Sequence, residues 1–273
     1  MFGISLLRGY VGGSAAIIDR LVAGSASGDL FTLTHGVNEM DLILVSGTYY
    51  WVQDNKTASI LRHAATIAGL SSASVDATIT VRYPSIQYDG TTWHVWGQDT
   101  STTRIDHYTA SSPTGSWTLA DNFGTGNSDP QVRQDPLTGT WYCAYKNVST
   151  LYVGMYSASS PDGPWTDLGY TFTTAGHPSY ASAEEADPCP AFFAGSAYLS
   201  FAGWNGSTQV IAMVQLDRSN SMQALDQGTV IRSPGGGWED SKIFSPVFLD
   251  DGPRLYYSAN LGDTTAGWGY VQG

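Results

Sequence analysis

Residues 108–118 read YTASSPTGSWT and residues 156–166 read YSASSPDGPWT, so eight of eleven positions are identical at an offset of 48 residues. A match of this quality indicates an internal repeat. Each copy runs from a β-type segment through Ser-Ser-Pro and a glycine into Trp-Thr, which is typical of a hairpin between two strands. The pair predicts a β protein built from units of about fifty residues.

A second pattern places five such units along the chain. An apolar run, a glycine-containing turn and an aromatic run follow one another in residues 41–52, 84–96, 130–145, 188–201 and 246–259. A small antiparallel sheet cannot bury both of its faces alone, whereas a ring of such sheets can. We therefore predict an all-β fold, a five-bladed β-propeller of four-stranded antiparallel blades. Its units are expected to begin near residues 38, 82, 128, 185 and 240.

The two ends of the chain are expected to meet in the last blade. The fifth unit runs out at residue 273 after sequence for only three strands, and the segment DLFTLT at residues 29–34 can supply the missing outer strand. Closing the ring in this way removes an exposed sheet edge. We expect a single propeller domain over residues 1–273, within which residues 1–28 fit neither repeat pattern.

Charge and hydropathy argue against two classes of partner. Twelve basic and twenty-four acidic residues give a formal net charge of −12, which repels the phosphate backbone of nucleic acids. No apolar run approaches the roughly 20 residues that a transmembrane helix needs. The N-terminal residues also lack the pattern of a secretory signal peptide. We expect neither nucleic-acid binding nor membrane insertion, and an extracellular or surface-associated location is slightly favoured.

Acidic residues stand where the innermost strands of the predicted blades begin. These strands surround the central axis of a propeller, so side chains at their starts converge on one funnel. An aspartate before a strand is also a common turn residue, so each acid has a structural alternative. The polar side chains at these five places are Asn38, Glu39, Asp41, Arg82, Tyr83, Asp129, Glu184, Glu185, Asp187, Glu239 and Asp240.

Five blades, the YSASSPDGPWT hairpin and the Asp129-Pro130 pair followed by a Gly-Thr-Trp-Tyr turn together resemble glycoside hydrolase family 43, which contains arabinanases and β-xylosidases. The chain is more distantly similar to the invertase and levansucrase families. The resemblance covers residues 38–260 and implies inverting hydrolysis of a glycosidic bond. In that family, carboxylates from the first, third and fourth units act as general base, pKa modulator and general acid.

Carried onto this chain, the resemblance makes Asp41 the base, Asp129 the modulator and Glu185 the acid. Asp129 precedes a proline, as the family pattern has it. Asp41 does not, and Glu39 competes for its role. The family has Glu-Gly-Pro in the fourth unit, whereas residues 185–188 read Glu-Ala-Asp-Pro, so Asp187 competes with Glu185 for the place of the acid.

Three carboxylates suit this chemistry because one must be protonated to donate to the leaving oxygen while another must be ionised to activate water. A third negative charge nearby raises the pKa of the acid. Aromatic faces and acids together favour a neutral carbohydrate as the partner. The histidines share no ligand spacing, so neither a metal nor another cofactor is predicted. The candidate substrate-binding residues are Glu39, Arg82, Trp96, Asp187, Trp204 and Asp240.

Two functions are compatible with this sequence. The first is a glycoside hydrolase that acts on a neutral oligo- or polysaccharide through three carboxylates in the propeller funnel. The alternative is a non-catalytic carbohydrate-binding or surface-adhesion propeller, because the Asp-Pro and Glu-Gly-Pro matches are imperfect and one fold hosts many functions.

Overall fold

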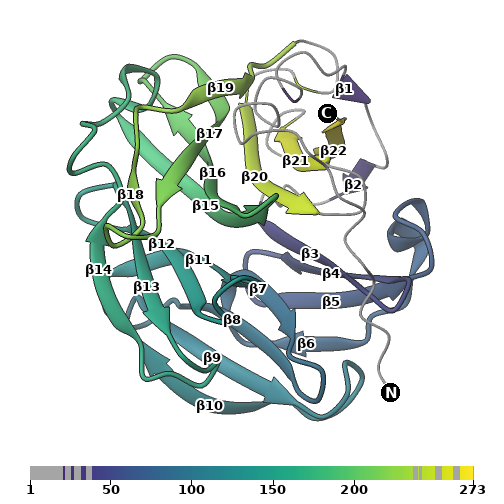
Figure 1. The fold of residues 1–273 in the computed structure, drawn as a ribbon. Coiled ribbons are helices and arrows are strands. Elements are labelled where there is room, and N and C mark those ends of the chain that lie inside the picture. The colour runs from purple at the N-terminus through teal and green to yellow at the C-terminus, as the bar shows by residue number, and fades with distance from the viewer. Residues whose placement is uncertain are drawn as a thin grey trace.

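A computed structural model describes residues 39–235 continuously, together with residues 21, 26–27, 32–34, 239, 242–249, 254–260 and 265–272. Its strands form five antiparallel sheets arranged as blades around a central axis (Figure 1). This is the predicted five-bladed β-propeller. Its innermost strands begin at Met40, Arg82, Asn127, Glu184 and Lys242, each within two residues of the predicted unit start.

The first three blades are four-stranded meanders in which sequential strands pair. Blade 1 consists of β3 (Met40–Val45), β4 (Thr48–Asp54), β5 (Ser59–Ala64) and β6 (Ala77–Ile79), with the 3-10 helix η1 (Ala68–Ser72) before β6. Blade 2 consists of β7 (Arg82–Tyr88), β8 (Trp93–Asp99), β9 (Arg104–Ala110) and β10 (Thr118–Phe123). Blade 3 consists of β11 (Asn127–Gln134), β12 (Trp141–Asn147), β13 (Val153–Ala158) and β14 (Thr166–Tyr170). The two repeated Ser-Ser-Pro motifs form the β9–β10 and β13–β14 hairpins, as predicted.

Blades 4 and 5 depart from this simple meander at their outer edges. Blade 4 consists of β15 (Glu184–Phe193), β16 (Ser196–Trp204) and β17 (Gln209–Asp217). Its outer edge is formed by β18 (Gln223–Ala224) and β19 (Thr229–Arg232), which both pair with β17. The 3-10 helix η2 (Ser179–Ala181) precedes β15. Blade 5 consists of β20 (Lys242–Leu249), β21 (Arg254–Asn260) and β22 (Thr265–Gln272). Two short N-terminal strands, β1 (Ala26–Ser27) and β2 (Thr32–Thr34), pair antiparallel with β22. The predicted closure of the last blade by an N-terminal strand is therefore confirmed.

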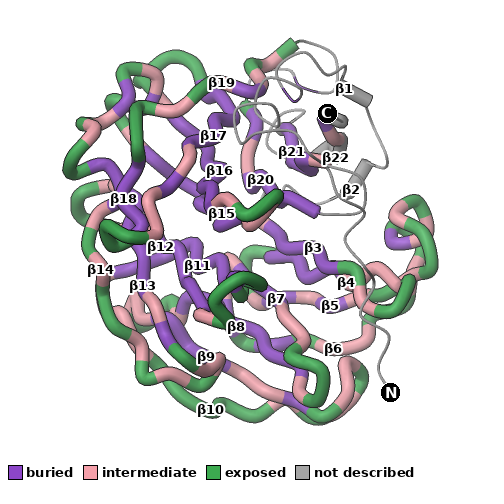
Figure 2. The backbone as a smooth tube through the Cα atoms, viewed as in Figure 1, coloured by how far each residue is buried: buried purple, intermediate pink, exposed green. Residues whose placement is uncertain are grey.

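The core lies between neighbouring blades, which Figure 2 shows as buried inner strands with exposed outer strands and turns. The strand alternation explains this, because one face of each blade packs on the blade before it and the other on the blade after it. Trp51 and Trp96 are fully buried in this way. Cys143 and Cys189 are both buried free thiols. Within the described ranges, no helix has the length and apolar character needed to cross a bilayer.

Candidate active site

A repeated irregularity shapes the inner strands of blades 2 to 5. In each, the pairing register shifts at a bulge, and the residue at the bulge has a positive φ of 45–52° and is followed by proline. Such a conformation costs a non-glycine residue about 1 kcal/mol or more, and bulges commonly re-aim a side chain beside a functional site. The four residues are Tyr83, Asp129, Asp187 and Ser245.

These four residues and Glu39, which directly precedes β3, surround one pocket, so every blade contributes one of them. The pocket is also lined by Met40, Gln131 and Pro246. Its cavity volume of about 10 Å³ is near the minimum that one ordered water needs. The side-chain Oε1 of Gln131 is buried and has no hydrogen-bond partner among the described residues. The predicted funnel therefore brings together three carboxylates, Glu39, Asp129 and Asp187.

Two of these carboxyls hold a proton unusually firmly. Burial and the negative charges of Asp187 and Asp129 raise the pKa of Glu39 to about 8. Burial and the charge of Asp129 raise the pKa of Asp187 to about 7, although Lys146 and the Ser245 N–H, which donates to Asp187 Oδ2 at 3.2 Å, act against this. Like charges that share a desolvated site disfavour each other's ionisation. A carboxyl that is protonated near neutral pH can serve as a general acid.

One lysine of blade 3 balances part of this negative charge. Lys146 Nζ lies 3.0 Å from Asp129 Oδ2 and 3.0 Å from Glu184 Oε1. Burial acts to lower the pKa of Lys146, but the charges of Asp129, Asp187 and Glu184 outweigh it and raise that pKa. Asp129 therefore has a close cationic partner, whereas Glu39 interacts with a cation, Arg82, without a close ion pair among the described residues.

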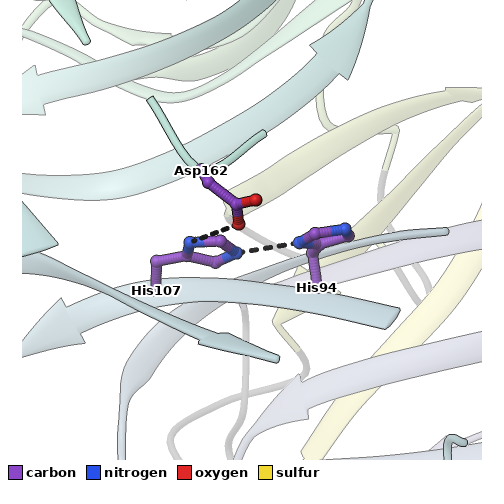
Figure 3. Close-up of side chains that lie close together, drawn as sticks. All are labelled: His94, His107 and Asp162. Carbon is purple, nitrogen blue, oxygen red and sulfur yellow. Dashed lines mark hydrogen bonds and ion pairs between the residues drawn. The ribbon is translucent and has the colours of Figure 1, made fainter. Parts of the chain in front are cut away.

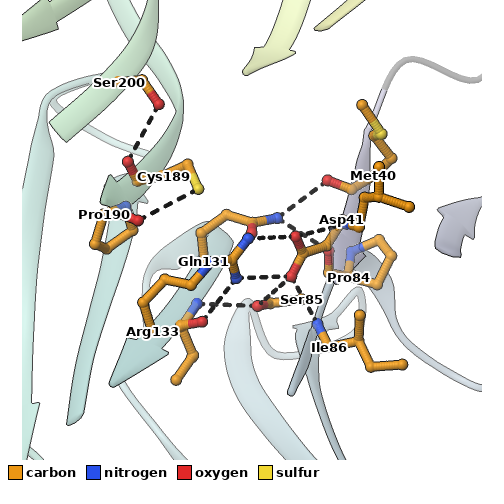
Figure 4. Close-up of polar contacts among 12 residues, drawn as sticks. Met40, Asp41, Pro84, Ser85, Ile86, Gln131, Arg133, Cys189, Pro190 and Ser200 are labelled. Atoms are coloured by element: carbon orange, nitrogen blue, oxygen red, sulfur yellow. Dashed lines mark hydrogen bonds and ion pairs between the residues drawn. The ribbon is translucent and has the colours of Figure 1, made fainter. Parts of the chain in front are cut away.

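Asp41 lies one layer deeper than the pocket and does not line it. Arg133 of blade 3 donates to its carboxylate from Nη2 at 2.6 Å and from Nη1 at 2.9 Å, and Ser85 Oγ and the Ile86 N–H of blade 2 donate at 3.0 and 2.9 Å (Figure 4). The side chain is fully buried and its hydrogen-bonding capacity is nearly filled. This arrangement joins three blades and leaves no oxygen facing a substrate.

Glu185 also lies outside the pocket lining. It is fully buried, accepts a hydrogen bond from the Val153 N–H at 2.9 Å, and its Oε1 lies 2.7 Å from His177 Nδ1. His177 stacks on Tyr152 with ring centroids 3.6 Å apart. Asp187 stands at the bulge of β15, where the pairing register shifts between Ala186 and Cys189, and it lines the pocket, whereas Glu185 precedes the bulge and does not.

The other candidate substrate-binding residues are spread over the molecule. Arg82 is paired with Asp54, whose Oδ2 lies 2.6 Å from its Nε. Trp96 is buried between blades 2 and 3 and stacks on His107. Trp204 ends β16, where Lys242 Nζ lies 5.3 Å from its ring centre. Asp240 lies outside the described residues.

A signal for the pocket residues is present in the sequence. Each bulge residue precedes a proline, so aligning the units on the pairs at 83–84, 129–130, 187–188 and 245–246 would have selected Tyr83, Asp187 and Ser245 together with Asp129. Unit one has Met40 in place of the proline and no bulge in β3. In unit one, Glu39 is indicated only by its position directly before the first inner strand.

No protein-family model matches the chain, and no curated protein matches it by sequence. Solved structures do match its fold. An α-L-arabinofuranosidase from Lactobacillus brevis is 13% identical with a TM-score of 0.62, covering 88% of this chain and 91% of that one. A family 43 endo-arabinanase from Bacillus licheniformis is 14% identical with a TM-score of 0.60, covering 90% and 94%. An exo-1,5-α-L-arabinanase from a bovine ruminal metagenomic library is 12% identical with a TM-score of 0.58, covering 88% and 97%. The chain therefore has the five-bladed β-propeller fold seen in glycoside hydrolases of family 43.

Proposed function

We propose that this protein is a glycoside hydrolase that cleaves a neutral oligo- or polysaccharide with inversion, using Glu39, Asp129 and Asp187. The observation that carries the proposal is the convergence of these three carboxylates from blades 1, 3 and 4 on one axial pocket, with the pKa values of Glu39 and Asp187 near neutrality. Glycoside hydrolysis needs one protonated and one ionised carboxyl on opposite faces of the sugar.

Roles follow from the order of the units in the resembling family. Asp187, in the fourth blade, is the general acid, since a pKa of about 7 is well matched to proton donation at neutral pH. Glu39, in the first blade, takes the place of the base by the order of the units alone, since its pKa of about 8 is the higher of the two and it must lose its proton to act. Asp129 is the ionised neighbour that raises the pKa of both. These positions replace Asp41 and Glu185, whose carboxylates are engaged in buried contacts.

The charge of the pocket selects the substrate class. Three carboxylates line it, so an anionic glycan such as a polyuronate would meet like charge. Neutral glycans carry hydroxyl donors that suit the carboxylates and the unpartnered Oε1 of Gln131. Calorimetric titration is expected to give weaker binding for uronate polymers than for neutral ones, and the reverse order would overturn this choice.

The test is kinetic and uses aryl arabinosides, xylosides, galactosides and fructosides. On the best substrate, Glu39→Gln should lower kcat by about 10²–10⁴-fold, the usual contribution of an acid or base. Asp187→Asn should lose as much on unactivated oligosaccharides but much less on nitrophenyl glycosides, because a good leaving group departs without protonation. Glu184→Gln is the matched control, since it removes a carboxylate that pairs with Lys146 outside the pocket lining.

A non-catalytic carbohydrate-binding propeller is the second candidate, favoured by the narrowness of the cavity, about 10 Å³. A protein that binds neutral glycans but hydrolyses none of the aryl glycosides would establish that alternative. Hydrolysis that survives both Glu39→Gln and Asp187→Asn would instead place the chemistry outside this pocket.

A further inference from the structure

A second group of titratable side chains lies at the interface of blades 2 and 3 (Figure 3). His94 comes from β8, His107 from β9 and Asp162 from the β13–β14 hairpin of the repeated Ser-Ser-Pro motif. In the β8–β9 pairing, Trp96 is opposite His107 and His94 is opposite Thr109. The two imidazoles are therefore diagonal neighbours on one face of the blade. Their facing atoms, His94 Nδ1 and His107 Nε2, are 2.9 Å apart.

These residues belong to a chain of contacts that lacks a positive charge. Asp89 Oδ2 lies 3.2 Å from His94 Nε2, His94 contacts His107, and Asp162 Oδ1 lies 3.9 Å from His107 Nδ1. The first two contacts are at hydrogen-bond distance and use the two N–H groups that two neutral imidazoles carry, whereas the 3.9 Å contact with Asp162 is too long for a hydrogen bond. His107 Nδ1 is buried and has no hydrogen-bond partner among the described residues.

A metal cation between His94 Nδ1 and His107 Nε2 would take the place of the hydrogen that these two facing nitrogens share. His107 is fully buried, and burial disfavours a charged imidazolium. A metal cation needs no such proton, because its ligands are the nitrogen lone pairs of neutral imidazoles. The Asp89 contact fits this alternative, since a metal-bound histidine commonly donates its other N–H to a carboxylate.

We propose that His94 Nδ1, His107 Nε2 and the Asp162 carboxylate form a site for a divalent transition metal of the Zn²⁺ type. One ligand atom from each of the three residues lies within 4.8 Å of the other two. Asp162 Oδ1 is 3.9 Å from His107 Nδ1, so the carboxylate must turn toward the Nε2 side of the ring to complete the set. Two imidazoles and one carboxylate, with water as the fourth ligand, are a set that Zn²⁺ accepts. The site is separate from the axial pocket, none of whose lining residues belongs to it.

Little movement is needed to admit the ion. Tetrahedral bonds of 2.0–2.1 Å place neighbouring ligand atoms about 3.3 Å apart, so the imidazole nitrogens must separate by a few tenths of an ångström. Asp162 stands on an exposed turn, where 66% of its side chain is accessible, and can turn inward. Because its ligands come from two blades, the ion would tie blade 2 to blade 3 and stabilise the fold.

The experiment uses the full chain without an affinity tag, stripped with a chelator and titrated with Zn²⁺ by calorimetry. We expect one equivalent of Zn²⁺ to bind and the Tm of the protein to rise when Zn²⁺ is present. Asp162→Ala, at an exposed position, should fold normally and lose both effects. Asp89→Asn should weaken Zn²⁺ binding by about 10–100-fold, because it removes the carboxylate that orients His94. Co²⁺ in place of Zn²⁺ should give a visible ligand-field band in the wild type and none in Asp162→Ala.

Two controls separate this site from adventitious binding. Asp121→Ala removes an exposed carboxylate from β10, and His63→Gln removes the exposed histidine paired with Asp76. Both variants should bind Zn²⁺ like the wild type. The proposal is overturned if the wild type binds no Zn²⁺, or if Asp162→Ala binds Zn²⁺ as tightly as the wild type. Neither readout uses hydrolysis, so the result is independent of the proposed catalytic role of the axial pocket.

Discussion

Glu39 and Asp41 are two residues apart at the start of the first blade, yet their carboxylates have opposite surroundings. Glu39 faces the axial pocket with Asp129 and Asp187, whose charges raise its pKa. Asp41 lies beneath the pocket in a bidentate contact with Arg133. Blade 4 repeats the contrast, because Asp187 faces like charges while Glu185 contacts His177. The acid paired with Arg133 joins blades here, and the acids gathered in the pocket are available for proton transfer.

The largest effect expected from this contrast is on stability. Asp41→Ala should lower the free energy of unfolding by about 3–5 kcal/mol, because it leaves the Arg133 guanidinium buried without its partner. Glu39→Gln should cost far less, since it removes a charge that its neighbours disfavour. Urea unfolding followed by tryptophan fluorescence compares the two. Equal losses for both variants would contradict the division between structural and pocket carboxylates.

A smaller effect should appear in the pH dependence of stability. The folded-state pKa values of Glu39 and Asp187, about 8 and about 7, lie above their ordinary values of 4.5 and 3.8. The folded protein therefore binds more protons than the unfolded chain between these limits, and stability must fall as pH rises from about 4 to about 8. Glu39→Gln and Asp187→Asn should each flatten this fall by at least about 1.4 kcal/mol, the equivalent of one pKa unit. Urea unfolding at several pH values measures the free energy of unfolding of each variant. If its dependence on pH is the same as in the wild type, these carboxyls ionise as they do in the unfolded chain.

The fold could be predicted because its causes are local and repeated. The matching hairpins at residues 108–118 and 156–166 and the five glycine turns fix the strand order within each blade, and the count of units fixes the ring. The closure of blade 5 by β2 also follows from counting strands, since a three-stranded last unit leaves an open edge, whereas the pairing of β1 with β22 was not predicted.

The site could be predicted only in part, because its composition depends on the bulges. The proline that follows Asp129 indicates its place, whereas Asp41 and Glu185 follow only from the unit order of the resembling family. Sequence spacing does not reveal that Arg133, 92 residues from Asp41, reaches across to pair with it. The His94, His107 and Asp162 group was missed for the same reason, since its members come from different hairpins and meet only where two blades pack.

The smallest effect tests the link between the pocket carboxylates themselves. Asp129→Asn keeps the shape of the side chain but removes the negative charge that raises the pKa of Asp187 and Glu39. Both carboxyls should then ionise at lower pH, so the alkaline limb of the pH–rate profile should move down by about one unit. Glu184→Gln provides the matched comparison, because the charge of Glu184 also raises the pKa of Asp187, but by less than that of Asp129, and is partly balanced by Lys146. A smaller shift in the same direction is expected for it. If Asp129→Asn moves the limb upward or not at all, Asp129 does not tune the acid, and its contact with Lys146 is structural in the same sense as that of Asp41 with Arg133.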